Sequence, residues 1–145
     1  MSPTRSLARP LLASMFITGG ADALRHPGPR ARAVEAAGLS NPEQLVRVNG
    51  AVQLLGGLAL ATGRFPRVAA LALAGTLVPT TYVGHAFWAA PDKAAKQQQQ
   101  IHFTKNLGLL GGLLLAAADT GGRESLPHAA GRVSRRTRAK LSPSN

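Results

Sequence analysis

Apolar residues along this chain gather into four blocks, which charged and polar segments separate. The charge-free cores of the blocks are residues 10–21, 48–63, 68–91 and 106–118. The third block runs from Val68 to Pro91, 24 residues without an Asp, Glu, Lys or Arg. Because a membrane-spanning helix needs about 20 mainly apolar residues, this block alone is long enough to cross a bilayer. The pattern therefore predicts an integral membrane protein.

The residues around the blocks indicate where helices begin. Pro10 and Pro66 suit the first turn of a helix, where a missing N–H costs no hydrogen bond. The segment Ser40-Asn41-Pro42-Glu43 is typical of a capped helix start, and Pro79 should kink the third helix. We expect an all-α fold, a bundle of four transmembrane helices at about residues 7–26, 42–62, 66–90 and 101–118.

The last part of the chain has a different composition. Six of the 17 Lys and Arg residues lie between Arg123 and Lys140, so much of the net charge of +11 belongs to this segment. We expect a membrane domain at residues 1–119 and a disordered basic tail at residues 120–145. A basic segment beside a bilayer gains about 1 kcal/mol per Lys or Arg at an anionic surface. Anionic lipid headgroups are thus the expected partner of the tail, and nucleic acid is not.

The second and fourth blocks contain nearly the same eight residues. Leu54-Leu-Gly-Gly-Leu-Ala-Leu-Ala61 is repeated as Leu109-Leu-Gly-Gly-Leu-Leu-Leu-Ala116. This repeat is compatible with a duplicated helical hairpin, although Gly and Leu are also common in unrelated spans. The small residues Gly56, Gly57, Gly111 and Gly112 should let helix backbones approach closely within the membrane.

Several segments allow a second interpretation. Arg5, Arg9, the apolar stretch after them and Ala21-Asp-Ala23 also fit a cleaved secretory signal, which would leave three spans. The first and fourth blocks have lengths that buried helices of soluble proteins also show. Residues 28–40 have the composition of a basic connection, and residues 92–100 fit either a loop or an amphipathic start to the fourth helix.

The distribution of Lys and Arg predicts the orientation in the membrane. With four spans, the N-terminus, the turn at residues 63–67 and the tail lie on one side and carry 10 of these residues, against 7 on the other. Because Lys and Arg accumulate on the cytoplasmic side, both termini of this multi-pass protein should be cytoplasmic.

Polar residues gather near the outer ends of the four expected helices. Spacings of three or four residues place such side chains on one helix face, as for Asp22 with His26 and for Thr81 with His85. Polar groups within spans usually face the bundle interior. The sequence thus predicts a pocket at the outer surface lined by Asp22, Gln53, Tyr82, His85, His102, Lys105 and Asn106. The alternative is solvation at the interface, with Tyr82, Phe87 and Trp88 as an aromatic belt.

The composition excludes several kinds of chemistry. Without any Cys, the chain has no disulfide, no thiolate nucleophile and no Cys-bound metal. No two histidines have a metal-ligand spacing, so we expect no metal site from His26, His85, His102 and Asp22. Motifs of nucleophilic catalysis, phosphate loops and dinucleotide binding do not occur, and no catalytic residue can be assigned.

The arrangement of motifs resembles the DoxX family of small four-helix integral membrane proteins. The similarity covers Arg9 to Ala118 and depends on Arg9-Pro10, Gly19-Gly20, Leu55-Gly-Gly-Leu-Ala-Leu-Ala-Thr-Gly63, Gly84-His-Ala-Phe-Trp88, His102-Phe-Thr-Lys-Asn106 and Gly111-Gly112. The family name comes from a subunit of a thiosulfate:quinone oxidoreductase, and relatives are linked to redox or oxidative-stress assemblies. The absence of Cys means that sulfur chemistry on the chain's own side chains does not carry over.

This resemblance implies an integral membrane subunit or anchor of a redox or oxidative-stress-related complex. Its cofactor would be a quinone, whose head would bind in the pocket at the outer surface, and its partner a protein of the same complex. One alternative is a small quinone-linked oxidoreductase in its own right, with His85 or His102 exchanging protons, since the reference pKa of histidine is about 6.5. Another alternative is a small transporter, which the apolar inner halves of the second and fourth helices disfavour.

Overall fold

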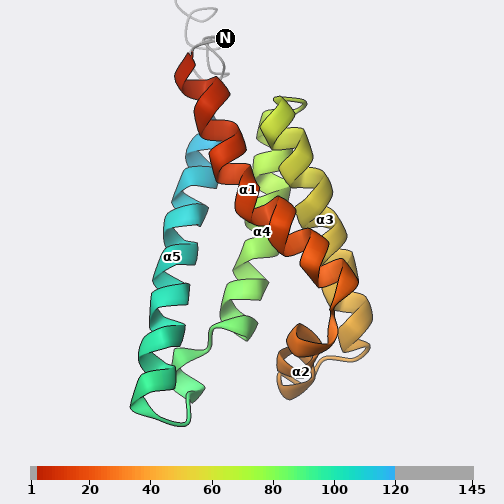
Figure 1. Cartoon of the computed structure of the whole chain (residues 1–145), viewed down its shortest axis with the longest axis vertical. Coiled ribbons are helices and arrows are strands. Elements are labelled where there is room, and N and C mark those ends of the chain that lie inside the picture. The colour runs from red at the N-terminus through yellow and green to blue at the C-terminus, as the bar shows by residue number, and fades with distance from the viewer. Residues whose placement is uncertain (1–2, 120–145) are drawn as a thin grey trace, which may run out of the picture.

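The computed structural model describes residues 3–119 and contains only helices and their connections within that range. Figure 1 shows the helices in chain order. Their bounds are α1 Pro3–Arg25, α2 Gly28–Ala36, α3 Pro42–Thr62, α4 Pro66–Gly84, the short 3-10 helix η1 Phe87–Ala89 and α5 Lys93–Ala118. The fold is therefore all-α, as predicted. The basic tail expected at residues 120–145 lies outside the described residues.

Three helical segments are long and apolar enough to cross a membrane: Pro42–Thr62, Pro66–Ala89 and Lys93–Ala118. Helix α1 is also long, but it does not meet the same measure of length and composition. Its apolar sequence is interrupted by Arg9, Asp22 and several Ser, Thr and Gly residues. The all-helical expectation is thus confirmed, whereas a bundle of four transmembrane helices stays a prediction.

Helix α1 crosses α3 at a point where the two backbones nearly touch (Figure 1). A Cβ atom built on Gly20 would lie only 2.6 Å from the carbonyl oxygen of Gly50. A Cβ on Gly57 would meet Ile17 of α1 at 2.8 Å. Of the glycines expected to admit close packing, Gly57 therefore does so, but Gly111 has no atom within 4 Å of its Cβ position. The closest approach uses Gly20 and Gly50.

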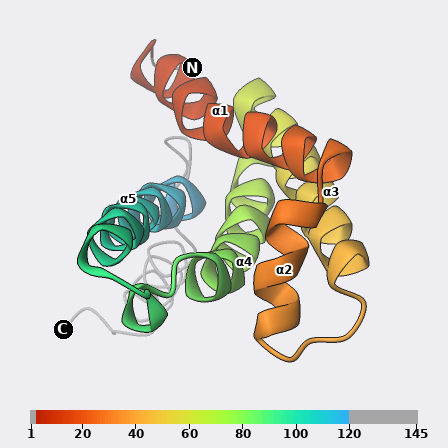
Figure 2. The ribbon, with the colours of Figure 1, turned by 60° about the horizontal axis from the view of Figure 1, so that its bottom comes forward.

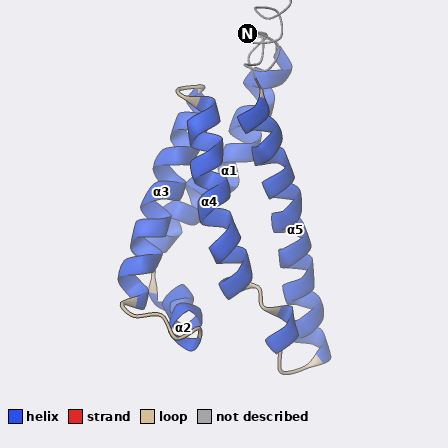
Figure 3. Ribbon diagram, turned by 180° about the vertical axis from the view of Figure 1, so that it is seen from behind, coloured by secondary structure: helices blue, strands red, loops and turns tan. Residues whose placement is uncertain are grey.

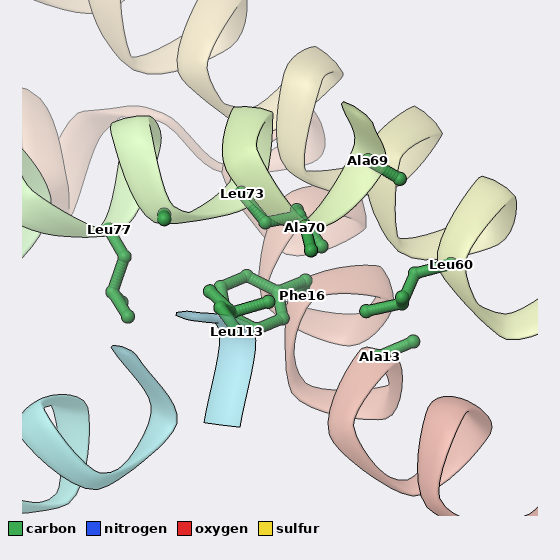
Figure 4. Packing of buried hydrophobic residues seen from close by; sticks show 9 residues of the cluster. Ala13, Phe16, Leu60, Ala69, Ala70, Leu73, Leu77 and Leu113 are labelled. Atoms are coloured by element: carbon green, nitrogen blue, oxygen red, sulfur yellow. The ribbon is translucent and has the colours of Figure 1, made fainter. Parts of the chain in front are cut away.

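One apolar core joins the four long helices, as the close view in Figure 4 shows. Phe16 of α1, Leu60 of α3, Leu73 of α4 and Leu113 of α5 are all buried within it. Helix α5 contributes least, because only 11% of its candidate span is buried, against 28% of the span in α3. Most of α5 therefore faces the surroundings of the protein.

The repeated segments of α3 and α5 differ in their packing. Leu60 of α3 is fully buried, whereas its counterpart in the repeat, Leu115, is 76% exposed. Conversely, Leu113 is fully buried while its counterpart Leu58 is 46% exposed. The two copies thus turn different faces to the core, and the duplicated hairpin stays a prediction.

The helix ends gather at two opposite ends of the molecule. Helix α2, the start of α3, the end of α4, η1 and the start of α5 lie together at the lower end in Figure 1, and Figure 2 brings this end forward. We call it the α2 end. At the opposite end, Nε of Arg67 donates to the carbonyl of Ala117 at 2.9 Å, and Arg5 pairs with Asp119 at 2.9 Å.

Several helix bounds differ from those expected. Residues 28–36 form α2 instead of a connection, because Pro27 and Pro29 fit the first turn and Gly38, with a φ of 77°, ends the helix. Helix α5 begins at Lys93 and not near residue 101, since the Asp92 side chain caps it by accepting from the Ala95 N–H at 2.8 Å.

Helix α4 ends at Gly84, short of the expected residue 90. Ala90 must be extended because Pro91 follows it, and the single turn of η1 occupies the space between. Pro10 also lies inside α1 and not in its first turn, because the helix already begins at Pro3.

The start of α3 lacks the expected cap. Asn41 takes the N-cap position with a left-handed backbone at a φ of 54° and makes no side-chain bond to the helix. A capping side chain needs an extended backbone, so the predicted cap is wrong, although Pro42 does open the helix.

Candidate functional site

The C-terminal half of α4 and the N-terminal half of α5 run in opposite directions beside each other near the α2 end (Figure 3). We call the contact between residues 77–85, at the end of α4 and directly after it, and residues 99–113 of α5 the α4–α5 seam. At the seam, Nδ2 of Asn106 donates a hydrogen bond of 3.0 Å to Oγ1 of Thr81, and both residues are buried. Interhelical hydrogen bonds of this kind stabilise helix association in a membrane.

A second pair lies one helical turn closer to the α2 end. His85, the residue directly after α4, follows Thr81 by four positions, and His102 precedes Asn106 by four in α5. The two imidazole rings stack with their centroids 5.0 Å apart and their planes at 20°. The seam therefore presents two successive polar pairs on facing helices.

Each imidazole has a neighbour that determines the role of its Nδ1 atom. Nδ1 of His85 lies 2.8 Å from Oε1 of Gln99, which can only accept, so this nitrogen carries a proton. Nδ1 of His102 lies 3.5 Å from Nζ of Lys105, which can only donate, so this nitrogen acts as an acceptor. The two rings thus differ at Nδ1, which donates to Gln99 in His85 and accepts from Lys105 in His102, and an imidazole is a side chain able to exchange protons.

Four aromatic rings cover the side of the seam next to η1. Trp88 lies 5.3 Å from Tyr82 and 5.1 Å from Phe87 between ring centroids. Phe103 of α5 meets Phe87 at 5.3 Å in an edge-to-face arrangement. Such pairs contribute about 0.5–1.5 kcal/mol beyond their buried area, so the cluster holds η1 against α5.

A small groove of about 170 Å³ follows the seam. Its lining combines aliphatic and aromatic side chains with the hydroxyl and amide of the inner polar pair: Leu77, Val78, Thr81, Tyr82, Phe103, Asn106, Leu107 and Leu110. Sites for small organic molecules typically have this character, mainly apolar with a few placed polar groups.

The residues of the predicted pocket lie in three regions. Five of them belong to the seam: Tyr82, His85, His102, Lys105 and Asn106. Gln53 instead lies at the contact of α3 with α1, where its Cβ is 3.1 Å from the Cβ position of Gly20. Asp22 lies at the junction of α1 and α2. The structure thus brings together only those predicted pocket residues that belong to the α4–α5 seam.

Asp22 forms a local ionic cluster outside the candidate spans. Its carboxylate accepts from Nη1 of Arg30 in α2 at 2.8 Å and contacts Nδ1 of His26 at 3.1 Å. The hydrogen bond from Arg30, and next that from His26, lowers the pKa of the Asp22 carboxyl below its ordinary value of 3.8. The cluster ties α2 to the end of α1.

Thr81, Gln99 and Phe103 are seam residues that the predicted pocket omitted. The spacing of four residues in the sequence places Thr81 on the same face as His85. Its contact with Asn106, however, depends on how α4 and α5 pack together. Gln99 was missed because residues 92–100 had no assigned structure; once α5 includes them, Gln99 shares the face of His102. Within residues 3–119, no group of three or more His, Asp or Glu side chains is placed to hold a metal ion.

A comparison with protein families gives one match. The DoxX family model matches residues 5–86, more than half of the chain, from α1 through Ala86 and without α5. Neither a curated protein nor a solved structure matches the chain. Together with the three helices able to span a membrane, this match identifies a membrane protein. The chain belongs to the DoxX family.

Proposed function

We propose that this protein is an integral membrane subunit or anchor of a redox or oxidative-stress-related complex, with a site for a quinone head at the α4–α5 seam. The observation that carries the proposal is the stacked pair of His85 and His102, about one helical turn from Thr81 and Asn106 in the lining of an apolar groove. This combination places two imidazoles, groups that can take up and release protons, near a surface that accepts an apolar ring.

The residues of the seam fit such a head. Tyr82 and Phe103 supply aromatic walls, and Asn106 supplies an amide within the groove. A bound quinone would contribute reversible uptake of electrons and protons. The protein's own part is to hold the ring between α4 and α5, to orient it through the Asn106 amide and to exchange a proton at His85 or His102.

The exposed surface of α5 supports a role as a subunit. Leu107, Leu114 and Leu115 are 52%, 53% and 76% exposed on a helix with little internal packing. In a bilayer, such a surface is available to lipid and to the spans of a partner protein.

The proposal includes four spans, with the apolar part of α1 at residues 10–21 as the fourth. Both termini would then be cytoplasmic and the α2 end outside. The start of α1, the turn between α3 and α4 and the end of α5 share one end of the molecule, which an even number of spans requires (Figure 1). If the tail lies on the same side, as this topology requires, that side carries 10 of the 17 Lys and Arg residues, six of them in the tail, for which anionic lipid headgroups are the proposed partner.

The second candidate is an oxidoreductase that acts with a quinone without a protein partner. The His102 contact with Lys105 favours it, because a lysine 3.5 Å from Nδ1 can return a proton to the ring. Purification in a mild detergent separates the two candidates. A redox protein in stoichiometric amount supports the subunit, bound quinone without a partner supports the enzyme, and neither in any preparation would contradict both.

A further inference from the structure

We infer that the groove of the α4–α5 seam selects a ring-sized head that carries a hydrogen-bond donor, such as a phenolic hydroxyl, and that Asn106 is the residue that recognises it. The inference deepens the proposed function, since it depends on the same ligand site. It concerns which chemical form of a ring the groove prefers.

The first step is the orientation of the Asn106 amide. Oγ1 of Thr81 donates its only proton to the carbonyl of Leu77 at 2.7 Å. Toward Asn106 this oxygen can therefore only accept, and it does so from Nδ2 at 3.0 Å. The hydrogen bond to Leu77 thereby fixes which side of the amide faces Thr81 and leaves Oδ1 on the other side.

The second step is the accessibility of Oδ1. Hydrogen bonds within residues 3–119 engage Asn106 through Nδ2 and not through Oδ1. Among these residues, however, no fully buried side-chain nitrogen or oxygen lacks a partner. Oδ1 is therefore reachable from outside, and the open space that Asn106 lines is the groove. An amide that is 6% exposed overall thus offers one acceptor to a ligand.

The third step is the size and shape of the ligand. A groove of about 170 Å³ is well below the usual volume of pockets that enclose drug-sized molecules, roughly 300–1,000 Å³. It admits a single ring, while a tail would remain outside in the lipid. Tyr82 and Phe103 line it, and their rings favour a flat aromatic head over a flexible chain.

The chemical consequence is a preference between a ring that carries a hydroxyl and the same ring with that hydroxyl methylated. A hydroxyl on the ring donates to Oδ1 of Asn106, whereas its methyl ether cannot and leaves this acceptor without a partner. One hydrogen bond contributes about 0.5–1.5 kcal/mol, so the hydroxyl form should bind roughly two- to tenfold more tightly.

The single tryptophan of the chain reports on the groove. Trp88 contacts Tyr82 and Phe103, which both line it. Fluorescence of the full chain in detergent can therefore be titrated with para-hexylphenol and with its methyl ether, using concentrations measured in the detergent phase. Asn106→Leu and Thr81→Val test the acceptor and its orientation. Asn49→Leu is the matched control, because Asn49 of α3 donates a similar bond of 3.1 Å to Thr80 and neither of these two residues lines the groove.

The inference predicts a roughly two- to tenfold preference for the phenol, lost in Asn106→Leu, reduced in Thr81→Val and kept in Asn49→Leu. Equal binding of the two probes to the unchanged protein would overturn the inference and leave the ligand site in place. A preference that survives in Asn106→Leu would also overturn it. No response to either probe would overturn both the inference and the site. The probe comparison on the unchanged protein decides the question even where a variant does not fold.

Discussion

Gly20 of α1 and Gly50 of α3 bring two helix backbones into direct contact. A Cβ on Gly20 would lie 2.6 Å from the carbonyl oxygen of Gly50, and one on Gly50 would lie 2.9 Å from the Cβ of Ala23. In lipid, where apolar burial does not drive helix association, such close packing is a main source of stability. It also attaches α1, the helix with the weakest membrane signal, to a segment that can span on its own.

Replacing Gly20 or Gly50 with Ala should destabilise the protein by about 1–3 kcal/mol, the usual cost of overpacking. The matched control is Gly111→Ala, since the Cβ position of Gly111 has no atom within 4 Å. In an exposed helix, this change should be neutral or stabilise by up to about 1 kcal/mol. Thermal unfolding in detergent, followed by circular dichroism, measures all three, and equal stability of Gly20→Ala and Gly111→Ala would contradict the packing described.

The attachment of α2 should weaken at low pH. Because the folded structure lowers the pKa of Asp22, its ion pair contributes full stability above the ordinary value of 3.8 and loses it as pH falls through the lowered value. Amide hydrogen exchange in α2 should therefore accelerate by a small factor in acid, whereas exchange in the core of α3 should change less.

Asp22→Asn should give the same faster exchange in α2 at neutral pH and remove its acid dependence. Glu43→Gln serves as the control, because Glu43 pairs with Arg47 within α3 at 3.5 Å and does not contact α2. Unchanged exchange in Asp22→Asn would show that the pair with Arg30 does not hold α2 in place.

The proposed orientation can be tested by labelling, since the chain has no native Cys. Ser40→Cys, in the connection after α2, should react with an impermeant maleimide in intact cells. Phe65→Cys, at the exposed turn between α3 and α4, should react only after permeabilisation. The opposite pattern would show that the bias of Lys and Arg assigns the wrong sides, and equal labelling from outside would contradict a span between the two positions.

The sequence predicted those parts of the fold that depend on local signals. The apolar block after Pro42 and the left-handed Gly63 mark the two ends of α3, and Pro66 marks the start of α4. The bounds near η1 were less predictable, because Gly84 to Trp88 continue an uncharged run that fits a helix as well as a turn. Helix α5 begins at Lys93 and includes a run of Gln residues. Gln has good helix propensity, but the run has no periodic apolar pattern from which a helix could be predicted.

The candidate site shows a similar limit. Spacing along a helix places His85 on the face of Thr81 and His102 on the face of Asn106, which the sequence does show. The sequence does not show which neighbouring helix each of these two faces packs against. Gln53 was grouped with the histidines because of its depth in the membrane, yet its face turns to α1. Gln53 is separated from the two histidines because α4 packs against α5, whereas Gln53 packs against α1.

The most direct test of the account compares histidine variants in a mild-detergent purification. His85→Ala and His102→Ala should each remove the bound quinone or the redox partner while membrane insertion stays intact, and the double variant should cost little more than either, as expected of residues that act as a unit. His26→Ala is the control, because His26 contacts Asp22 outside the seam. This variant should retain both the bound quinone and the redox partner. Retention of quinone and partner in both seam variants would contradict a functional site between α4 and α5.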